Sequence, residues 1–138
     1  NKVQTKAIQL VRELAVSELA AVRAALPDVI LLAVVHVEDA SAIERAKSYE
    51  LSADYILLDS GKPTAGILGG TGNTHDWSVS KRIVEEVEIP VLLAGGLNAE
   101  NVKDALDGVN PYGVDLCSGV RTDGHLDPDK LRDFVAQL

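Results

Sequence analysis

The sequence predicts an α/β fold built around a parallel sheet. Short runs rich in Val, Leu and Ile recur along the chain, and an amphipathic helical pattern follows each of them. The runs are almost continuously apolar instead of alternating with polar residues, as expected for strands that are covered on both faces. Successive runs start about one βα unit apart, which favours parallel strands joined by crossover helices.

Five strands are expected, in the segments AIQLV from Ala7, VILLAVVHV from Val29, ADYILLDS from Ala53, IPVLLAGG from Ile89 and GVDLCSG from Gly113. Helices are expected over residues 17–26, 40–51, 76–87, 98–106 and 128–138, and candidate caps are Ser17, Asp39, Asp76 and Asn98. Five such units fit either an open doubly wound sheet or five-eighths of a (β/α)₈ barrel, whose full length is typically about 250 residues.

Length and composition indicate one soluble globular domain over residues 1–138. The sequence is 46% hydrophobic and 25% charged, and it has no apolar run long enough to span a membrane. A net charge of −8 argues against nucleic-acid binding, although backbone amides can bind a small phosphate without basic side chains. The single Cys117 favours a reducing, cytoplasmic setting and is expected to be a buried structural thiol. Because the chain begins at Asn1 and contains no Met, we expect it to be a fragment or to have lost its start.

Two glycine-containing junctions follow the last two expected strands. Gly95 and Gly96 stand between an apolar strand and the helix start near Asn98, and Ser118 and Gly119 end the next strand. A phosphate needs backbone N–H groups within about 3 Å, which a Cβ would obstruct, and the last strand ends of a barrel commonly form such a site. The alternative is that these glycines only allow tight turns.

Other candidates lie at the carboxyl ends of the expected strands. Asp59 ends YILLDS and fits either a general acid or base or a structural hydrogen-bond acceptor. Asp115 is expected to point into the interior, and His36 is expected to be packed instead of catalytic. The glycine-rich segment 67–77 fits a flap over a ligand or a plain surface loop, and Trp77 is expected to pack in the core or beneath it. No spacing of His, Cys or carboxylates indicates a metal site.

A larger set of motifs resembles one family. The segments AIQLVRE, LLDS, LGGTGNTHDW, PVLLAGGLNAENVKDAL and PYGVDLCSGVRTDGHLDPDKLRDFV stand in the order and spacing of phosphoribosylanthranilate isomerase, an enzyme of tryptophan biosynthesis. The resemblance covers nearly the whole chain. It implies a (β/α)₈ barrel, of which this chain carries about the last five βα units.

The resemblance also implies an activity and roles for particular residues. The family converts N-(5'-phosphoribosyl)anthranilate into 1-(2-carboxyphenylamino)-1-deoxyribulose 5-phosphate by an Amadori rearrangement, without a cofactor or metal. Asp59 matches the general acid that opens the ribose ring. The phosphate cradle matches Gly95, Gly96, Ser118 and Gly119, and the loop near the anthranilate matches Gly69, Gly70, Thr71 and Gly72.

The sequence departs from the family pattern in several places. The general-base cysteine of the family lies in a Lys-Ile-Cys-Gly motif that is absent here, and Cys117 matches a position on the eighth strand instead. The usual His-Gly after QL is replaced by Val11 and Arg12, the usual Phe by His75 and the usual Glu by Arg121. Two interpretations fit the two arginines: they add positive charge at the site, or they are solvated residues on its rim. We favour the second. A non-catalytic sugar-phosphate-binding relative or fragment is therefore the alternative to an isomerase.

The expected partners follow from the same arguments. They are a small phosphorylated substrate and either a second copy of the chain or an amino-terminal segment that completes the barrel. Nucleic acid and membrane are not expected as partners. Exposed strand edges and apolar barrel-facing side chains are the reason to expect association.

Overall fold

The main feature of the computed structural model, which describes residues 5–60 and 77–138, is a five-stranded parallel sheet. Its strands are β1 (Ala7–Leu10), β2 (Ile30–His36), β3 (Tyr55–Asp59), β4 (Val91–Leu93) and β5 (Gly113–Val114). They lie side by side in chain order, and each neighbouring pair is parallel. A doubly wound sheet would show a reversal of strand order, so that alternative is wrong for the described residues.

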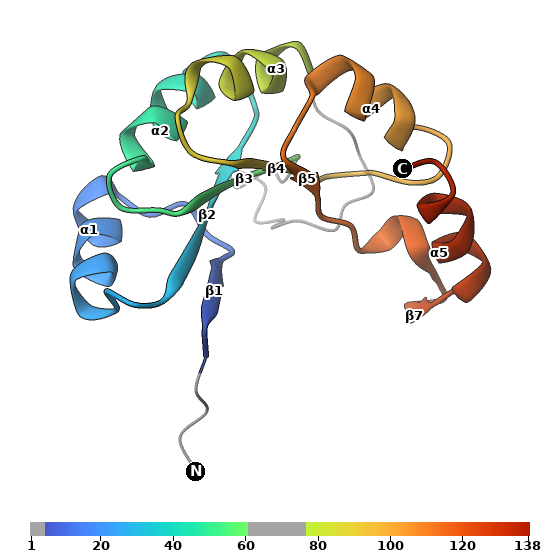
Figure 1. Cartoon of the computed structure of the whole chain (residues 1–138), viewed down its shortest axis with the longest axis horizontal. Helices are drawn as coiled ribbons and strands as arrows, with labels where there is room; N and C mark the ends of the chain where they lie inside the picture. The colour runs from blue at the N-terminus through green and yellow to red at the C-terminus, as the bar shows by residue number, and fades with distance from the viewer. Residues whose placement is uncertain (1–4, 61–76) are drawn as a thin grey trace.

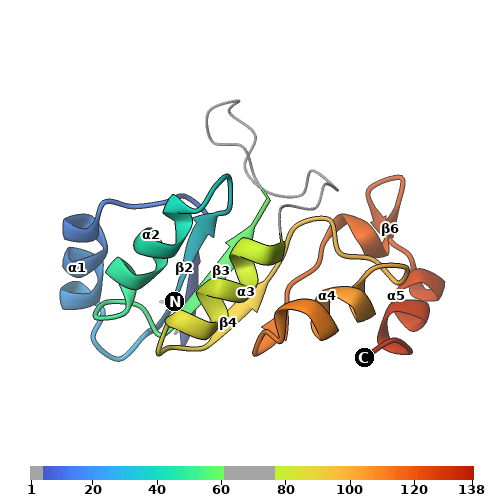
Figure 2. The same cartoon turned by 90° about the horizontal axis from the view of Figure 1, so that it is seen from above.

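The helices form an arc outside the sheet (Figure 1). They are α1 (Val16–Ala25), α2 (Ser41–Tyr49), α3 (Trp77–Glu86), α4 (Val102–Val109) and α5 (Pro128–Val135). Figure 2 shows that α1 to α5 follow one another across the molecule in chain order, as the strands do. Within the described ranges, none of these helices has the length and apolar character that a membrane crossing requires.

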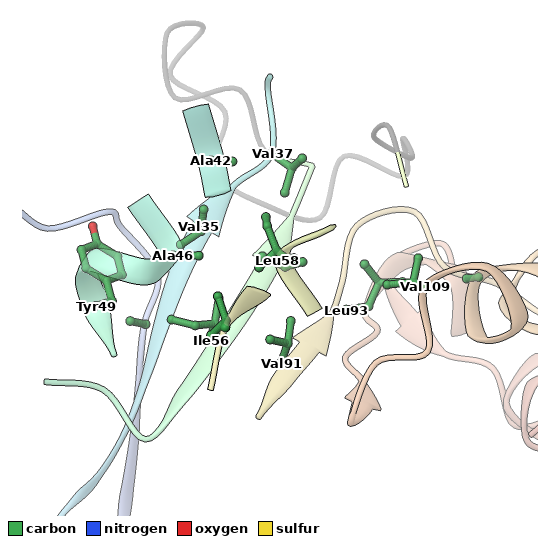
Figure 3. Packing of buried hydrophobic residues seen from close by; sticks show 14 of the residues in the cluster. Val35, Val37, Ala42, Ala46, Tyr49, Ile56, Leu58, Val91, Leu93 and Val109 are labelled. Atoms are coloured by element: carbon green, nitrogen blue, oxygen red, sulfur yellow. The ribbon is translucent and has the colours of Figure 1, made fainter. Parts of the chain in front are cut away.

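The core lies between the sheet and this layer of helices (Figure 3). The pairing register places Val35, Leu58 and Leu93 in one row across β2, β3 and β4, so their side chains share one face of the sheet. All three are fully buried in a cluster with Ala46 and Tyr49 of α2. The expected strands and helices are therefore confirmed in type, with ends shifted by a few residues.

The expected cap at Ser17 is wrong, whereas Asn98 caps the turn that leads into its helix. The first turn of α1 starts one residue before Ser17, and there the carboxylate of Glu18 accepts the backbone N–H of Ala15 at 2.9 Å. Helix α4 begins at Val102, but the turn that leads into it begins at Asn98, whose carbonyl oxygen accepts the N–H of Val102 at 3.0 Å. The Asn98 side chain accepts the N–H of Asn101 at 3.1 Å, and the Asn101 side chain accepts that of Asn98 at 2.9 Å. This reciprocal pair caps the turn, so Asn98 has the capping role expected from the sequence.

A short hairpin follows the sheet and was not expected from the sequence. Strands β6 (Arg121–Thr122) and β7 (His125–Leu126) pair antiparallel. Between them Asp123 and Gly124 both have positive φ, at 50° and 79°. The Asp-Gly pair that allows this turn is a known hairpin signal, so the sequence did contain the information.

Arg23 ties α1 to the amino-terminal end of the sheet. Its guanidinium donates to the carbonyl oxygens of Val29 at 2.9 Å and Ser52 at 3.1 Å, and it forms an ion pair with Asp54. Asp54 in turn accepts the N–H of Leu31 in β2 at 2.7 Å. One side chain thus joins the segments that enter β2 and β3, at the opposite end of the sheet from the candidate site.

Candidate ligand site at the carboxyl ends of the strands

A pocket lies where β3, β4 and β5 end. The residues that line it are Asp59, Ala94, Gly95, Gly96, Leu97, Asp115, Leu116, Cys117 and Ser118. Four of the five predicted site residues that the structure describes therefore meet in one place, although they are far apart in the sequence. The fifth, Gly119, lines an adjoining hollow with Asn98 and Lys130. This convergence follows from the topology, because parallel strands place all their carboxyl ends at one edge of the sheet.

The backbone after β4 has a conformation that requires glycine. Gly95 and Gly96 have φ values of 86° and 67°, in the left-handed region. A Cβ added to Gly95 would lie 2.5 Å from the Oγ and 2.7 Å from the backbone N of Ser60, so the strand-end segments after β3 and β4 are in close contact. Within the described residues, neither Gly95 nor Gly96 donates its N–H to an acceptor. Two backbone donors therefore remain available at the pocket.

The segment after β5 is equally close to the segment after β4. A Cβ added to Gly119 would lie 1.9 Å from the carbonyl oxygen of Leu97, far inside van der Waals contact. Gly119 belongs to the 3₁₀ helix η2 (Ser118–Val120), whose first N–H groups have no acceptor within the helix itself. The glycines thus have a packing reason that holds without any ligand, and their phosphate role remains a prediction.

Two carboxylates border the pocket. One oxygen of Asp59, Oδ1, accepts the backbone N–H of Ser60 at 2.8 Å. Asp115 is exposed and lies just after β5, so the expectation that it points into the interior is wrong. Partial desolvation of its carboxyl group raises the pKa of Asp115, and the negative charge of Asp59 raises it further.

Cys117 is exposed and lines the pocket, so the prediction of a buried thiol is wrong. The prediction assumed that the last strand extends through Cys117. In the structure β5 ends at Val114, because only two of its residues pair with β4. The chain then turns into η2, and this turn brings Asp115 and Cys117 to the surface of the pocket. Placing the end of β5 at Val114 would identify both residues as pocket residues.

His36 is buried at the end of β2, as expected for a packed histidine. Trp77 begins α3 and packs partly buried against the core, as expected. Arg121 is exposed and donates to the carbonyl oxygen of Gly124 at 3.0 Å, which fits the rim interpretation. Arg12 is also exposed.

The predicted loop residues and two neighbouring positions lie outside the described residues. These are Gly69, Gly70, Thr71, Gly72, His75 and Asp76. Among residues 5–60 and 77–138, no group of three His, Cys, Asp or Glu residues is arranged to hold a metal ion. That the reaction needs no cofactor or metal stays a prediction.

The described residues form an α/β fold with a singly wound parallel sheet and a pocket at the carboxyl ends of its strands. The family model described as N-(5'phosphoribosyl)anthranilate (PRA) isomerase matches residues 1–137. The chain therefore belongs to the PRA isomerase family.

Individual relatives agree with this assignment. The chain is 42% identical to N-(5'-phosphoribosyl)anthranilate isomerase of Methanosarcina acetivorans, over 99% of this chain and 62% of that protein. It is 34% identical to the solved phosphoribosyl anthranilate isomerase of Thermotoga maritima, with a TM-score of 0.79, over 98% of this chain and 62% of that one. Another similar structure is a phosphoribosyl anthranilate isomerase in complex with reduced 1-(o-carboxyphenylamino)-1-deoxyribulose 5-phosphate, with a TM-score of 0.75 and 31% identity over 98% of this chain and 60% of that one. The chain thus spans about 62% of the length of the relatives it matches.

Proposed function

We propose that the intact protein is an aldose-ketose isomerase that converts N-(5'-phosphoribosyl)anthranilate into 1-(2-carboxyphenylamino)-1-deoxyribulose 5-phosphate. The observation that carries this proposal is the convergence of Asp59, Gly95, Gly96 and Ser118 on one pocket. The membership of the chain in the PRA isomerase family supplies the reaction.

The proposal includes a closed (β/α)₈ barrel in which the five described strands are the last five. Their sequential parallel order and the single outer layer of helices support it (Figure 1). The chain also spans only 62% of its Thermotoga maritima relative. In this arrangement β1 and β5 would pair with the strands that complete the barrel.

Asp59 is proposed as the general acid. Its carboxyl group would give its proton to the ribose ring oxygen while the bond from that oxygen to C1' breaks and the amine lone pair forms the C1'–N double bond. A base would then remove the proton from C2', and the resulting enolamine would become the ketose. The family's cysteine base is absent from this sequence, so the base is assigned to the part of the barrel that the chain does not contain.

The substrate phosphate is proposed to bind at the glycine junctions after β4 and β5. Gly95 and Gly96 offer backbone N–H groups without acceptors among the described residues, and Ser118 and Gly119 open η2. Backbone donors bind a phosphate without basic side chains, which agrees with the acidic composition of the chain. A homodimer and a cytoplasmic location complete the proposal.

Replacement of Asp59 tests the proposal. In the intact protein, Asp59→Asn should lower turnover by about 10²- to 10⁴-fold, the usual contribution of a general acid. Affinity for the reduced product analogue should change little, because the phosphate contacts remain. Asp28→Asn, which alters an exposed carboxylate between α1 and β2, is the matched control and should keep full turnover. Comparable turnover in Asp59→Asn would refute the acid role, and analogue binding without any wild-type turnover would favour a sugar-phosphate-binding protein.

A further inference from the structure

We propose that the imidazole of His36 hydrogen-bonds the aminobenzoate end of the substrate, beside the general acid Asp59. This inference rests on the proposed function and adds a ligand contact to it. It depends on three features of His36: its burial without a partner, its place in the strand register and the anchoring of its backbone.

The ring of His36 is buried without a hydrogen-bond partner. The residue is only 2% exposed, and neither Nδ1 nor Nε2 has a partner within the part of the chain that the structure describes. Most buried polar side-chain atoms in proteins do have a partner, because an unpaired one destabilises the folded state. A strand position that needed only packing would accept an aliphatic residue such as the neighbouring Val35. The imidazole therefore indicates a polar contact that the described residues do not supply.

The register places this ring next to Asp59. His36 and Asp59 are paired positions in the parallel strands β2 and β3, so their side chains lie on the same face of the sheet. The preceding paired positions, Val35 and Leu58, point into the core beneath the helices (Figure 3). His36 and Asp59 thus face away from the helices, toward the side on which Asp59 lines the pocket.

The backbone of His36 is anchored on both sides. Its N–H donates to Oε1 of Glu13 at 2.6 Å, and its carbonyl oxygen accepts from the guanidinium of Arg45 at 3.2 Å. The same Glu13 oxygen lies 3.5 Å from Nε of Arg45, so the two side chains brace each other. An anchored backbone fixes the position of Cβ, and burial restricts rotation of the ring, so the imidazole loses less entropy when it binds a ligand.

The order of strand ends indicates which part of the ligand His36 would meet. The proposed phosphate contacts lie after β4 and β5, Asp59 ends β3 and His36 ends β2. Neighbouring strands are about 4.8 Å apart, so His36 is about 10 to 14 Å from the phosphate side of the pocket and about 5 Å beyond Asp59. A substrate with its phosphate at the glycines and its ring oxygen at Asp59 extends its aminobenzoate group toward β2. An imidazole N–H is a suitable donor to the carboxylate of that group.

The test uses isothermal titration calorimetry to measure the affinity of two ligands for the intact wild-type protein and for its His36→Phe variant. The first ligand is the reduced product analogue, which carries the carboxyphenylamino group, and the second is ribose 5-phosphate, which lacks it. Loss of a hydrogen bond to a charged group should weaken binding of the analogue by about 10- to 100-fold and leave that of ribose 5-phosphate within about twofold. Urea unfolding should show no loss of stability, because Phe removes an unpartnered buried polar group.

A matched control removes another buried polar group on the opposite side of the sheet. The hydroxyl of Tyr49 in α2 donates to the carbonyl oxygen of Leu14. Tyr49→Phe should therefore lower stability and leave both affinities unchanged, the reverse of the pattern expected for His36→Phe. Equal binding of the analogue by His36→Phe and wild type would overturn the inference, as would equal losses for both ligands.

Two further measurements keep the result interpretable. If His36→Phe does not fold, His36→Asn and His36→Gln place an amide donor near one or the other ring nitrogen, and one of them should retain more analogue affinity than the other. Wild-type affinity for the analogue in both His36→Asn and His36→Gln would overturn the inference. Wild-type turnover is measured first, because its absence overturns the proposed function, whereas normal turnover with unchanged analogue binding in His36→Phe overturns only the role of His36.

Discussion

Replacing Gly119 by Ala should destabilise the protein strongly, although it adds only one methyl group. The new Cβ would lie 1.9 Å from the carbonyl oxygen of Leu97 and 3.1 Å from the Cα of Asn98. Ordinary contact of such atoms needs about 3.5 Å, so one of two backbone segments must move by roughly 1.5 Å. Overpacking typically costs about 1 to 3 kcal/mol, and we expect about 3 kcal/mol because backbone cannot yield as a flexible side chain does.

Urea unfolding of the intact protein measures this effect. With an m-value of about 2 kcal/mol/M, a loss of about 3 kcal/mol lowers the midpoint by about 1.5 M. Gly108→Ala is the matched control, because a Cβ at Gly108 in α4 would meet no heavy atom within 4 Å. Ala in the last turn of α4 should raise stability by up to about 1 kcal/mol and the midpoint by up to about 0.5 M. A Gly119→Ala midpoint within about 0.2 M of wild type, at an unchanged m-value, would refute the reasoning.

Two further predictions concern charged side chains. Arg23→Met removes the guanidinium that pairs with Asp54 and the backbone carbonyls around it, and should cost about 2 kcal/mol in a urea titration; wild-type stability would contradict the structural role of this network. Folding raises the pKa of Asp115 above the usual Asp pKa of about 3.9. Between these two pKa values the native state binds more protons than the unfolded chain. The contribution of Asp115 to stability therefore falls as the pH rises from the lower pKa to the higher one. Asp115→Asn should therefore gain stability over wild type near neutral pH and lose that advantage below about pH 3.5, and a difference that is constant with pH would contradict the sign.

The strand segments and part of the site were accessible from the sequence because they depend on local patterns. Continuous apolar runs predict the five strands, including their order along the chain. Once the strands were placed, their carboxyl ends indicated Asp59, Gly95, Gly96 and Ser118, and these residues do line one pocket. Their catalytic and phosphate-binding roles remain predictions.

The errors arose where a local pattern depends on a distant partner. The end of β5 is set by how many residues can pair with β4, and its early end at Val114 exposes Cys117 and Asp115. The hairpin of β6 and β7 is a different case, because its Asp-Gly turn is a local signal that the sequence itself contains.

The sequence by itself determined the α/β class, the five strands and the family resemblance, because periodicity and motif order are properties of neighbouring residues. Only the tertiary structure decided between an open doubly wound sheet and a sequential parallel one, since strand order is a relation between segments. It also showed that Gly119 approaches the Leu97 carbonyl oxygen and that His36 lies beside Asp59. These relations depend on register and on distances between backbone segments, which a single sequence does not contain.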